Sequence, residues 1–265
     1  MGCELEFFLL REDNSLPLEI NLEERIAELK AELMQKLPAI YQVEKEMGAS
    51  QIEVKTKPIS DLSALCDHIT QAKIIIHQYA QNKGLIASFA AQPFKDDCGN
   101  ALQCNISWQD HDEQDFNQAT ASLLKYTNQM LPLLASKAED FQRFDVALNK
   151  ALHQKGKYVA PTYLAYGKDN RSAAIRLIDS RLEFRVPCAD ADPYLTIIAV
   201  LFALLRGAEE KVKLKNSDQV YGNAFDEQYS FKKITCSSLE TPFISELLEI
   251  LFEVIFDKGD EKNTI

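Results

Sequence analysis

Alternating apolar and polar residues predict several strands in this chain. Leu182, Phe184 and Val186 alternate with a row of charged residues at positions 181, 183 and 185. Successive side chains of a strand point to opposite faces, so the apolar set fills a core and the charges share the other face. The same alternation recurs over residues 4–10, 51–55 and 102–107. We therefore expect four strands, each with one dry and one wet face.

The wet faces of these strands carry groups that suit metal and phosphate chemistry. Glu4, Glu6 and Glu53 lie on two of the strands, and Arg181 and Arg185 lie on another. Clustered carboxylates repel one another unless a cation lies among them, and hard divalent ions prefer oxygen ligands. Arginine forks match phosphate oxygens. A half-exposed antiparallel sheet explains any one strand equally well, but the four together indicate a sheet that lines a cavity.

Apolar residues at helical spacing predict helices between these strands. The predicted helices cover residues 22–37, 61–83, 114–137, 138–154, 192–206 and 240–256. Asp61 is a suitable N-cap for the second of them. The order of elements predicts an α+β fold with a curved, mainly antiparallel sheet backed by helices. Without repeats or an internal linker, residues 1–265 are expected to form a single domain.

Composition narrows the classes of partner and the cell compartment. The net charge of −11 argues against nucleic acid and anionic membranes as partners. No apolar run reaches the roughly 18 residues that a membrane span needs. Six scattered cysteines without a CxxC pair indicate reduced thiols and a cytoplasmic location. We therefore expect small-molecule substrates.

Short sequence blocks follow one another in an order typical of one family. The blocks are residues 2–8 (GCELEFF), 46–54 (EMGASQIEV), 88–93 (SFAAQP), 97–99 (DCG), 158–161 (YVAP), 170–172 (NRS), 181–185 (RLEFR) and 192–195 (DPYL). In these blocks and their spacing the chain resembles the catalytic domain of glutamine synthetase. The resemblance implies the glutamine synthetase/guanido kinase type of catalytic-domain fold.

The resemblance assigns five carboxylates to two divalent ions, Mg²⁺ or Mn²⁺. It gives Glu6, Glu46 and Glu53 to the first ion, and Glu4 and Glu183 to the second. Gln103 stands where the family has a metal-binding histidine, and Asn105 stands at the next histidine of that pattern. A glutamine carbonyl oxygen can still be a metal ligand, although a weaker one that does not titrate near neutral pH.

The resemblance also implies binding sites for ATP as co-substrate and for an acidic substrate. The ATP set is Arg171, Arg176, Arg181 and Ser107, and the substrate set is Arg143, Gly99 and Arg185. Arg171 and Arg185 are the implied catalytic residues, with Arg185 contacting both glutamate and the acyl phosphate. His153 competes with Arg143 for the substrate-arginine position if the alignment is anchored on Tyr158. The local context favours Arg143.

Several family residues are replaced or lacking. Val159 stands in place of the flap glutamate that accepts a proton from ammonium, and valine cannot accept one. Cys98 replaces an asparagine of the substrate loop, and residues 145–157 resemble an insertion in the flap. The family's N-terminal β-grasp domain is expected to be absent, so that either a separate partner supplies it or the chain no longer makes glutamine; a homo-oligomer is the other assembly expected. Two parts of the ammonium site are thus altered.

These features predict an ATP-dependent carboxylate-amine ligase of glutamine synthetase type, acting through an acyl phosphate with an altered amine site. The five carboxylates favour this activity, because an unselected cluster of charges would be costly to keep. The alternative is a catalytically impaired homologue that binds nucleotide or glutamate, or serves as an assembly subunit. Loss of the flap acid favours that alternative.

Overall fold

The computed structural model describes residues 1–260 except residues 18, 109–112, 158, 237 and 239, with no side chains beyond residue 254. Tyr158, one end of the YVAP block, therefore lies outside the described residues. The strands are β1 (Gly2–Leu10), β2 (Ile40–Lys45), β3 (Gln51–Thr56), β4 (Ile86–Ser88), β5 (Leu102–Ile106), β6 (Tyr166–Lys168), β7 (Ile175–Ile178) and β8 (Arg181–Phe184).

All eight strands form one sheet, with β1 near its middle. The order is β2-β3-β1-β5-β8-β7-β6, and β4 pairs with the far end of β1. Every pairing is antiparallel except that of β6 with β7. The predicted α+β fold with a mainly antiparallel sheet is confirmed. The shortest strands, β4 and β6, have only three residues each and escaped the sequence pattern.

The helices largely follow the prediction. They are α1 (Leu22–Lys36), α2 (Leu62–Asn82), α3 (Glu113–Leu134), α4 (Val146–Gln154), α5 (Pro193–Glu209) and α6 (Pro242–Asp260), with 3-10 helices η1 (Ala138–Phe144) and η2 (Asn216–Asp218). Asp61 is the N-cap of α2, as predicted, and its carboxylate accepts a hydrogen bond from the backbone N–H of Ala64.

The single helix predicted over residues 138–154 is wrong. The chain leaves the helical conformation at Asp145, whose carboxylate accepts a hydrogen bond from the backbone N–H of Leu148 and caps α4. An N-cap residue has extended backbone angles, so the capping aspartate ends η1 and starts a new helix. Residues 138–154 thus form two short helices in place of one long one.

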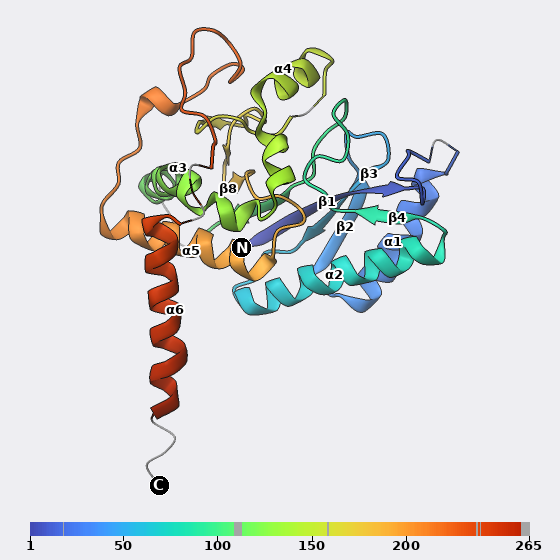
Figure 1. Ribbon diagram of the computed structural model, residues 1–265, viewed down its shortest axis with the longest axis horizontal. Helices are drawn as coiled ribbons and strands as arrows, with labels where there is room; N and C mark the ends of the chain where they lie inside the picture. The colour runs from blue at the N-terminus through green and yellow to red at the C-terminus, as the bar shows by residue number, and fades with distance from the viewer. Residues whose placement is uncertain (18, 109–112, 158, 237, 239, 261–265) are drawn as a thin grey trace.

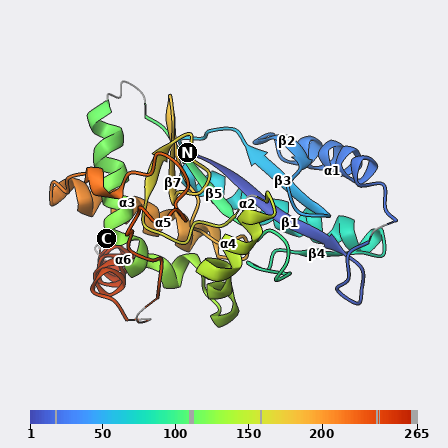
Figure 2. The same ribbon diagram turned by 90° about the horizontal axis from the view of Figure 1, so that it is seen from above.

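Helices cover one face of the sheet and leave the other face to polar side chains. Leu5, Phe7 and Leu9 of β1 lie in the main hydrophobic core, and α1, α2 and α5 lie on one side of the sheet in Figure 1. Figure 2 shows the same layers from above, with α4 on the near side of the sheet and α2 behind it. The polar face of β1, β5 and β8 therefore looks toward the segments around α4.

The C-terminal part of the chain packs beside this layer. The helix α3 runs along α5, and the start of α6 contacts α3. The rest of α6 projects away from the body of the domain (Figure 1). Among the helices that the structure describes, none combines the length and apolar character of a transmembrane span.

Candidate functional site

The predicted wet faces of the strands meet in one polar surface across the middle of the sheet. Strand pairing places Glu6 opposite Glu53, and Glu4 opposite Gln103. On the other side of β5, Asn105 lies opposite Glu183. Residues directly opposite one another on antiparallel strands have side chains within contact distance. The register therefore puts the carboxylates of β1 between Glu53 of β3 and the amides of β5.

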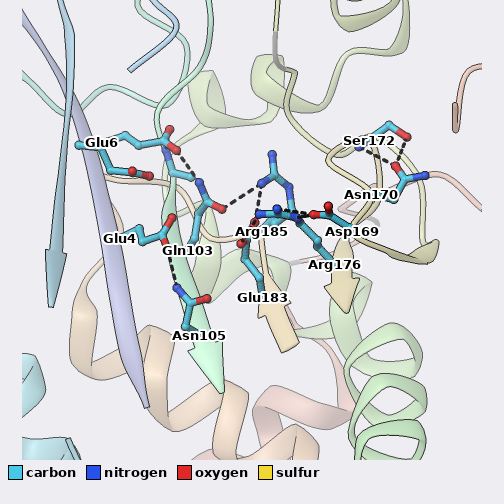
Figure 3. Close-up of polar contacts among 12 residues, drawn as sticks. Glu4, Glu6, Gln103, Asn105, Asp169, Asn170, Ser172, Arg176, Glu183 and Arg185 are labelled. Carbon is cyan, nitrogen blue, oxygen red and sulfur yellow. Dashed lines mark hydrogen bonds and ion pairs between the residues drawn. The ribbon is translucent and has the colours of Figure 1, made fainter. Parts of the chain in front are cut away.

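Two side-chain amides on β5 connect these carboxylates to arginines. Gln103 donates from Nε2 to the Glu6 carboxylate at 2.6 Å and accepts at Oε1 from Arg185 at 3.1 Å. Asn105 donates to Glu4 at 3.0 Å and accepts from Nε of Arg181 at 2.8 Å. Figure 3 shows the amides of Gln103 and Asn105 turned toward Glu6 and Glu4. The two amides thus join an acidic half of the site, which contains Glu4 and Glu6, to a basic half, which contains Arg181 and Arg185.

Glu183 organises the basic half. Its two carboxylate oxygens accept hydrogen bonds from Arg185 at 2.6 Å and Arg176 at 3.0 Å, and Arg176 also pairs with Asp169 (Figure 3). Burial would raise the pKa of Glu183, but the charges of Arg185 and Arg176 outweigh it and hold that pKa below its ordinary value. Glu183 is therefore a charged anchor that fixes both guanidinium groups.

Two carboxylates of the acidic half, Glu6 and Glu53, are buried, and Glu4 and Glu46 are partly exposed. Burial, followed by the charge of Glu46, raises the pKa of Glu6 to about 7. Burial and the charges of Glu4 and Glu6 likewise raise the pKa of Glu53, while Lys55 opposes that rise. Such a set of buried oxygen ligands with uncompensated charge fits a divalent cation.

The acidic half is not already gathered into a metal-binding cluster. Within the described residues, no three acidic, histidine or cysteine side chains lie close enough to hold an ion. The Glu6 carboxylate accepts hydrogen bonds from the Gln103 side chain and from the backbone N–H of Ala101, and Glu53 forms an ion pair with Lys55. A bound ion would have to draw the carboxylates away from these partners.

A small cavity lies where the two halves meet. Its volume is about 30 Å³, roughly the share of one water molecule in the liquid. Its walls include Glu6, Glu46, Gly99, Gln103, Arg143, Val159, Arg171 and Arg185. The structure thus brings most of the predicted metal and substrate residues around one space. An amino acid could enter only if part of the wall moves.

Arg143 and His153, the two candidates for the substrate-arginine position, lie in different surroundings. The Arg143 guanidinium is buried in the cavity wall, where it donates to the backbone carbonyls of Val186 at 2.7 Å and Arg185 at 3.1 Å. His153 is exposed on α4 and contacts Asn223. Of the two, Arg143 lines the small cavity and His153 does not.

The predicted ATP residues do not share a single space. Arg181 and Ser107 line a cavity of about 270 Å³ together with Glu4 and Lys55. Arg171 lies in the turn before β7 and faces the smaller cavity instead. Arg176 is directed at Glu183 and Asp169. The larger cavity borders both the acidic half and the arginine-bearing strand β8.

Several contacts of the site could not be predicted from the sequence. Asp169 has a left-handed backbone, with φ of 47°, in the turn that leads to its partner Arg176. Lys157 pairs with the buried Asp97 across a separation of 60 residues. Lys55 follows the strand alternation, which placed it on the wet face, but nothing in that pattern predicts its partners.

Asn149 links helix α4 to the cavity. Its side-chain amide donates to the backbone carbonyl of Arg143 at 2.8 Å and accepts from the backbone N–H of Ala160 at 3.0 Å. Asn149 is almost completely buried, so these hydrogen bonds are protected from competing water. The insertion predicted at residues 145–157 thus supports both Arg143 and the segment that carries Val159.

The sequence is similar to known ligases of the glutamine synthetase type. Gamma-glutamylputrescine synthetase of Escherichia coli is 26% identical over 69% of the chain. Glutamate--methylamine ligase of Methyloversatilis universalis is 30% identical over 63% of the chain, and glutamine synthetase of Pyrococcus abyssi is 26% identical over 80%. The chain spans 40%, 40% and 52% of the lengths of these relatives, respectively.

The fold and the family are shown by two further comparisons. The solved structure described as "GmaS/ADP complex-Conformation 1" matches 94% of this chain and 63% of that protein with a TM-score of 0.75, at 22% sequence identity. The family model for the glutamine synthetase catalytic domain matches residues 16–242. By this match, which covers most of its length, the chain belongs to the glutamine synthetase family through its catalytic domain.

Proposed function

We propose that this chain is an ATP-dependent carboxylate-amine ligase that activates an acidic substrate as an acyl phosphate. The observation that carries the proposal is the pair of amide bridges on β5. They hold the buried Glu6 and the half-buried Glu4 next to the arginines Arg185 and Arg181 on one face of the sheet. Phosphoryl transfer depends mainly on positioning and charge stabilisation, which such an arrangement supplies.

The arginines of the cavity support an acidic substrate. Arg143 and Arg185 both line the cavity, and within the described structure the Nε–H of each is buried without a hydrogen-bond acceptor. A buried donor without a partner is costly, so an incoming carboxylate or phosphate oxygen would satisfy it. In this proposal Arg143 orients the substrate carboxylate, and Arg185 stabilises the charge that develops on the acyl phosphate.

The carboxylates would hold the divalent ion, with Glu6, Glu46 and Glu53 as its ligands. When bound, a divalent ion neutralises phosphate charge. The protein's own part is to keep these oxygen ligands buried and close to β8. Arg181 and Ser107, on the wall of the larger cavity, would bind the nucleotide phosphates. Arg171 would reach the same phosphates from the turn before β7.

The amine acceptor that fits best is a primary alkylamine. Val159 is buried and lines the small cavity, as Cys98 also does. Its apolar side chain offers van der Waals contact to a carbon next to the amine. Relatives named for methylamine and for putrescine, both alkylamines, support this choice.

The proposal is tested by supplying glutamate, ATP and Mg²⁺ with either methylamine or ammonium and measuring the amide product by mass spectrometry. We expect the methylamide to form faster than glutamine. Glu6→Gln should remove a metal ligand and lower the rate at least tenfold, while Glu12→Gln, at an exposed position outside the site, is the matched control. Efficient glutamine synthesis with no methylamide would contradict the proposed acceptor.

The alternative function is a subunit that binds nucleotide or glutamate without ligase activity. The specific observation that favours it is the valine in the cavity wall, since Val159 cannot accept a proton there. Binding of ATP and glutamate without any product, including a hydroxamate from hydroxylamine, would decide for this alternative. Hydroxylamine is the critical acceptor because it needs no deprotonation by the protein at neutral pH.

A further inference from the structure

Lys55 places a positive charge inside the group of carboxylates expected to bind metal. Its ammonium lies 2.7 Å from a carboxylate oxygen of Glu44 and 2.9 Å from one of Glu53. The register of β1 and β3 also puts Lys55 directly opposite Glu4. The lysine thus adjoins ligands that the family resemblance divides between two divalent ions.

The burial of this group strengthens the electrostatic attraction between Lys55 and the carboxylates. The Glu53 side chain is 5% exposed and the Lys55 side chain 21% exposed, so little water separates them. An ion pair in such surroundings is screened much less than one on the open surface. Lys55 therefore supplies part of the positive charge that a divalent ion would otherwise supply.

The carboxylates expected to bind the second ion also have hydrogen-bond partners within the chain. Glu4 accepts a hydrogen bond from Asn105, and Glu183 is held by Arg185 and Arg176. Glu53 and Glu183 thus form direct ion pairs with cations of the chain. By contrast, the Glu6 carboxylate accepts hydrogen bonds from neutral groups, the Gln103 amide and the backbone N–H of Ala101, and Glu6 lines the small cavity together with Glu46.

We propose that the Lys55 ammonium takes the place of one of the two divalent cations, so that this chain binds a single divalent ion, on the side of Glu6 and Glu46. This inference deepens the proposed function, because it concerns the metal content of the same site. It makes Lys55 a positioning residue, whose ammonium pairs with both Glu53 and Glu44. Replacing the lysine with a neutral residue frees Glu53 and removes a charge that repels incoming metal.

The test is a titration of the purified chain with Mn²⁺, followed by calorimetry and by electron paramagnetic resonance, without nucleotide or substrate. We expect about one tightly bound ion per wild-type chain. Lys55→Gln should bind a second ion, or bind the first roughly tenfold more tightly, because a unit charge beside a divalent ion is removed. Lys55→Arg keeps the charge and should bind like wild type.

Lys45 provides a matched control for the loss of charge. It is exposed at the end of β2, and Lys45→Gln makes the same change in net charge away from Glu53. That variant should bind Mn²⁺ as wild type does. If Lys55→Gln does not fold, Lys55→Met makes the same change of charge with a side chain that packs better in a half-buried position.

Melting temperature gives a second readout. Without metal, the Lys55→Gln protein should melt below wild type, since Glu44 and Glu53 lose their partner, and saturating Mn²⁺ should raise its melting temperature more than that of wild type. Unchanged stoichiometry and affinity in both neutral variants would overturn the inference, as would two tight ions in wild type. Ligase activity is scored separately by product formation, so the two proposals fail independently.

Discussion

The Gln103 bridge gives a quantitative prediction for stability. Gln103→Leu preserves the approximate size of a side chain that is 5% exposed. It removes the donor to Glu6 and the acceptor for Arg185. Hydrogen bonds to charged groups are worth about 1.5–3 kcal/mol each, and burial of the leucine offsets part of that loss. We expect a net destabilisation of about 2–4 kcal/mol.

For a chain of this size, that loss corresponds to a fall in melting temperature of about 5–10 °C. Urea denaturation and differential scanning calorimetry in the presence of EDTA would measure it. Gln81→Leu, at an exposed position near the end of α2, is the matched control and should change stability by less than about 0.5 kcal/mol. A Gln103→Leu protein as stable as this control would refute the bridging role of Gln103.

Three further predictions concern other parts of the structure. Val159→Glu adds a carboxylate to a cavity that already holds two, so its melting temperature in EDTA should fall and Mg²⁺ should restore part of the loss; an unchanged melting temperature would count against the cavity. Lys157→Ala leaves the buried Asp97 without its ion pair, and limited proteolysis should cut near residue 157 faster than in wild type; equal rates would contradict this role. Burial lowers the pKa of Lys73 to about 8, so the cost of burying its charge is present below pH 8 and is relieved as pH rises toward 10.5. The free energy of unfolding of wild type relative to Lys73→Met should therefore increase between pH 7.5 and 9.5, and a decrease would show that the lysine is stabilised as a cation.

Strand alternation predicted which residues lie on the polar face, because the period of two follows directly from backbone geometry. Glu4, Glu6, Gln103 and Asn105 all lie on the face expected of them. The choice of partners could not be predicted, since it depends on strand order and register. Nothing in the sequence shows that Gln103, at a position expected to bind metal, joins Glu6 to an arginine.

The regions around turns and short helices were the hardest to predict. Arg171 was expected to share a surface with Arg176, but it lies in a turn and faces a different cavity. The break at Asp145 depends on one capping hydrogen bond, which outweighed the helical periodicity of the flanking residues. Long-range pairs such as that of Lys157 with Asp97 arise only when the chain folds.

Acyl-phosphate formation from a carboxylate is the step on which the proposed function depends. Glutamate labelled with ¹⁸O in its carboxylates, incubated with ATP, Mg²⁺ and hydroxylamine, tests it directly through the isotopic composition of the released phosphate. The account predicts that each phosphate formed with hydroxamate carries one ¹⁸O atom, because the attacking carboxylate oxygen leaves with the phosphoryl group. Hydroxamate formed with unlabelled phosphate, or no consumption of ATP, would contradict it.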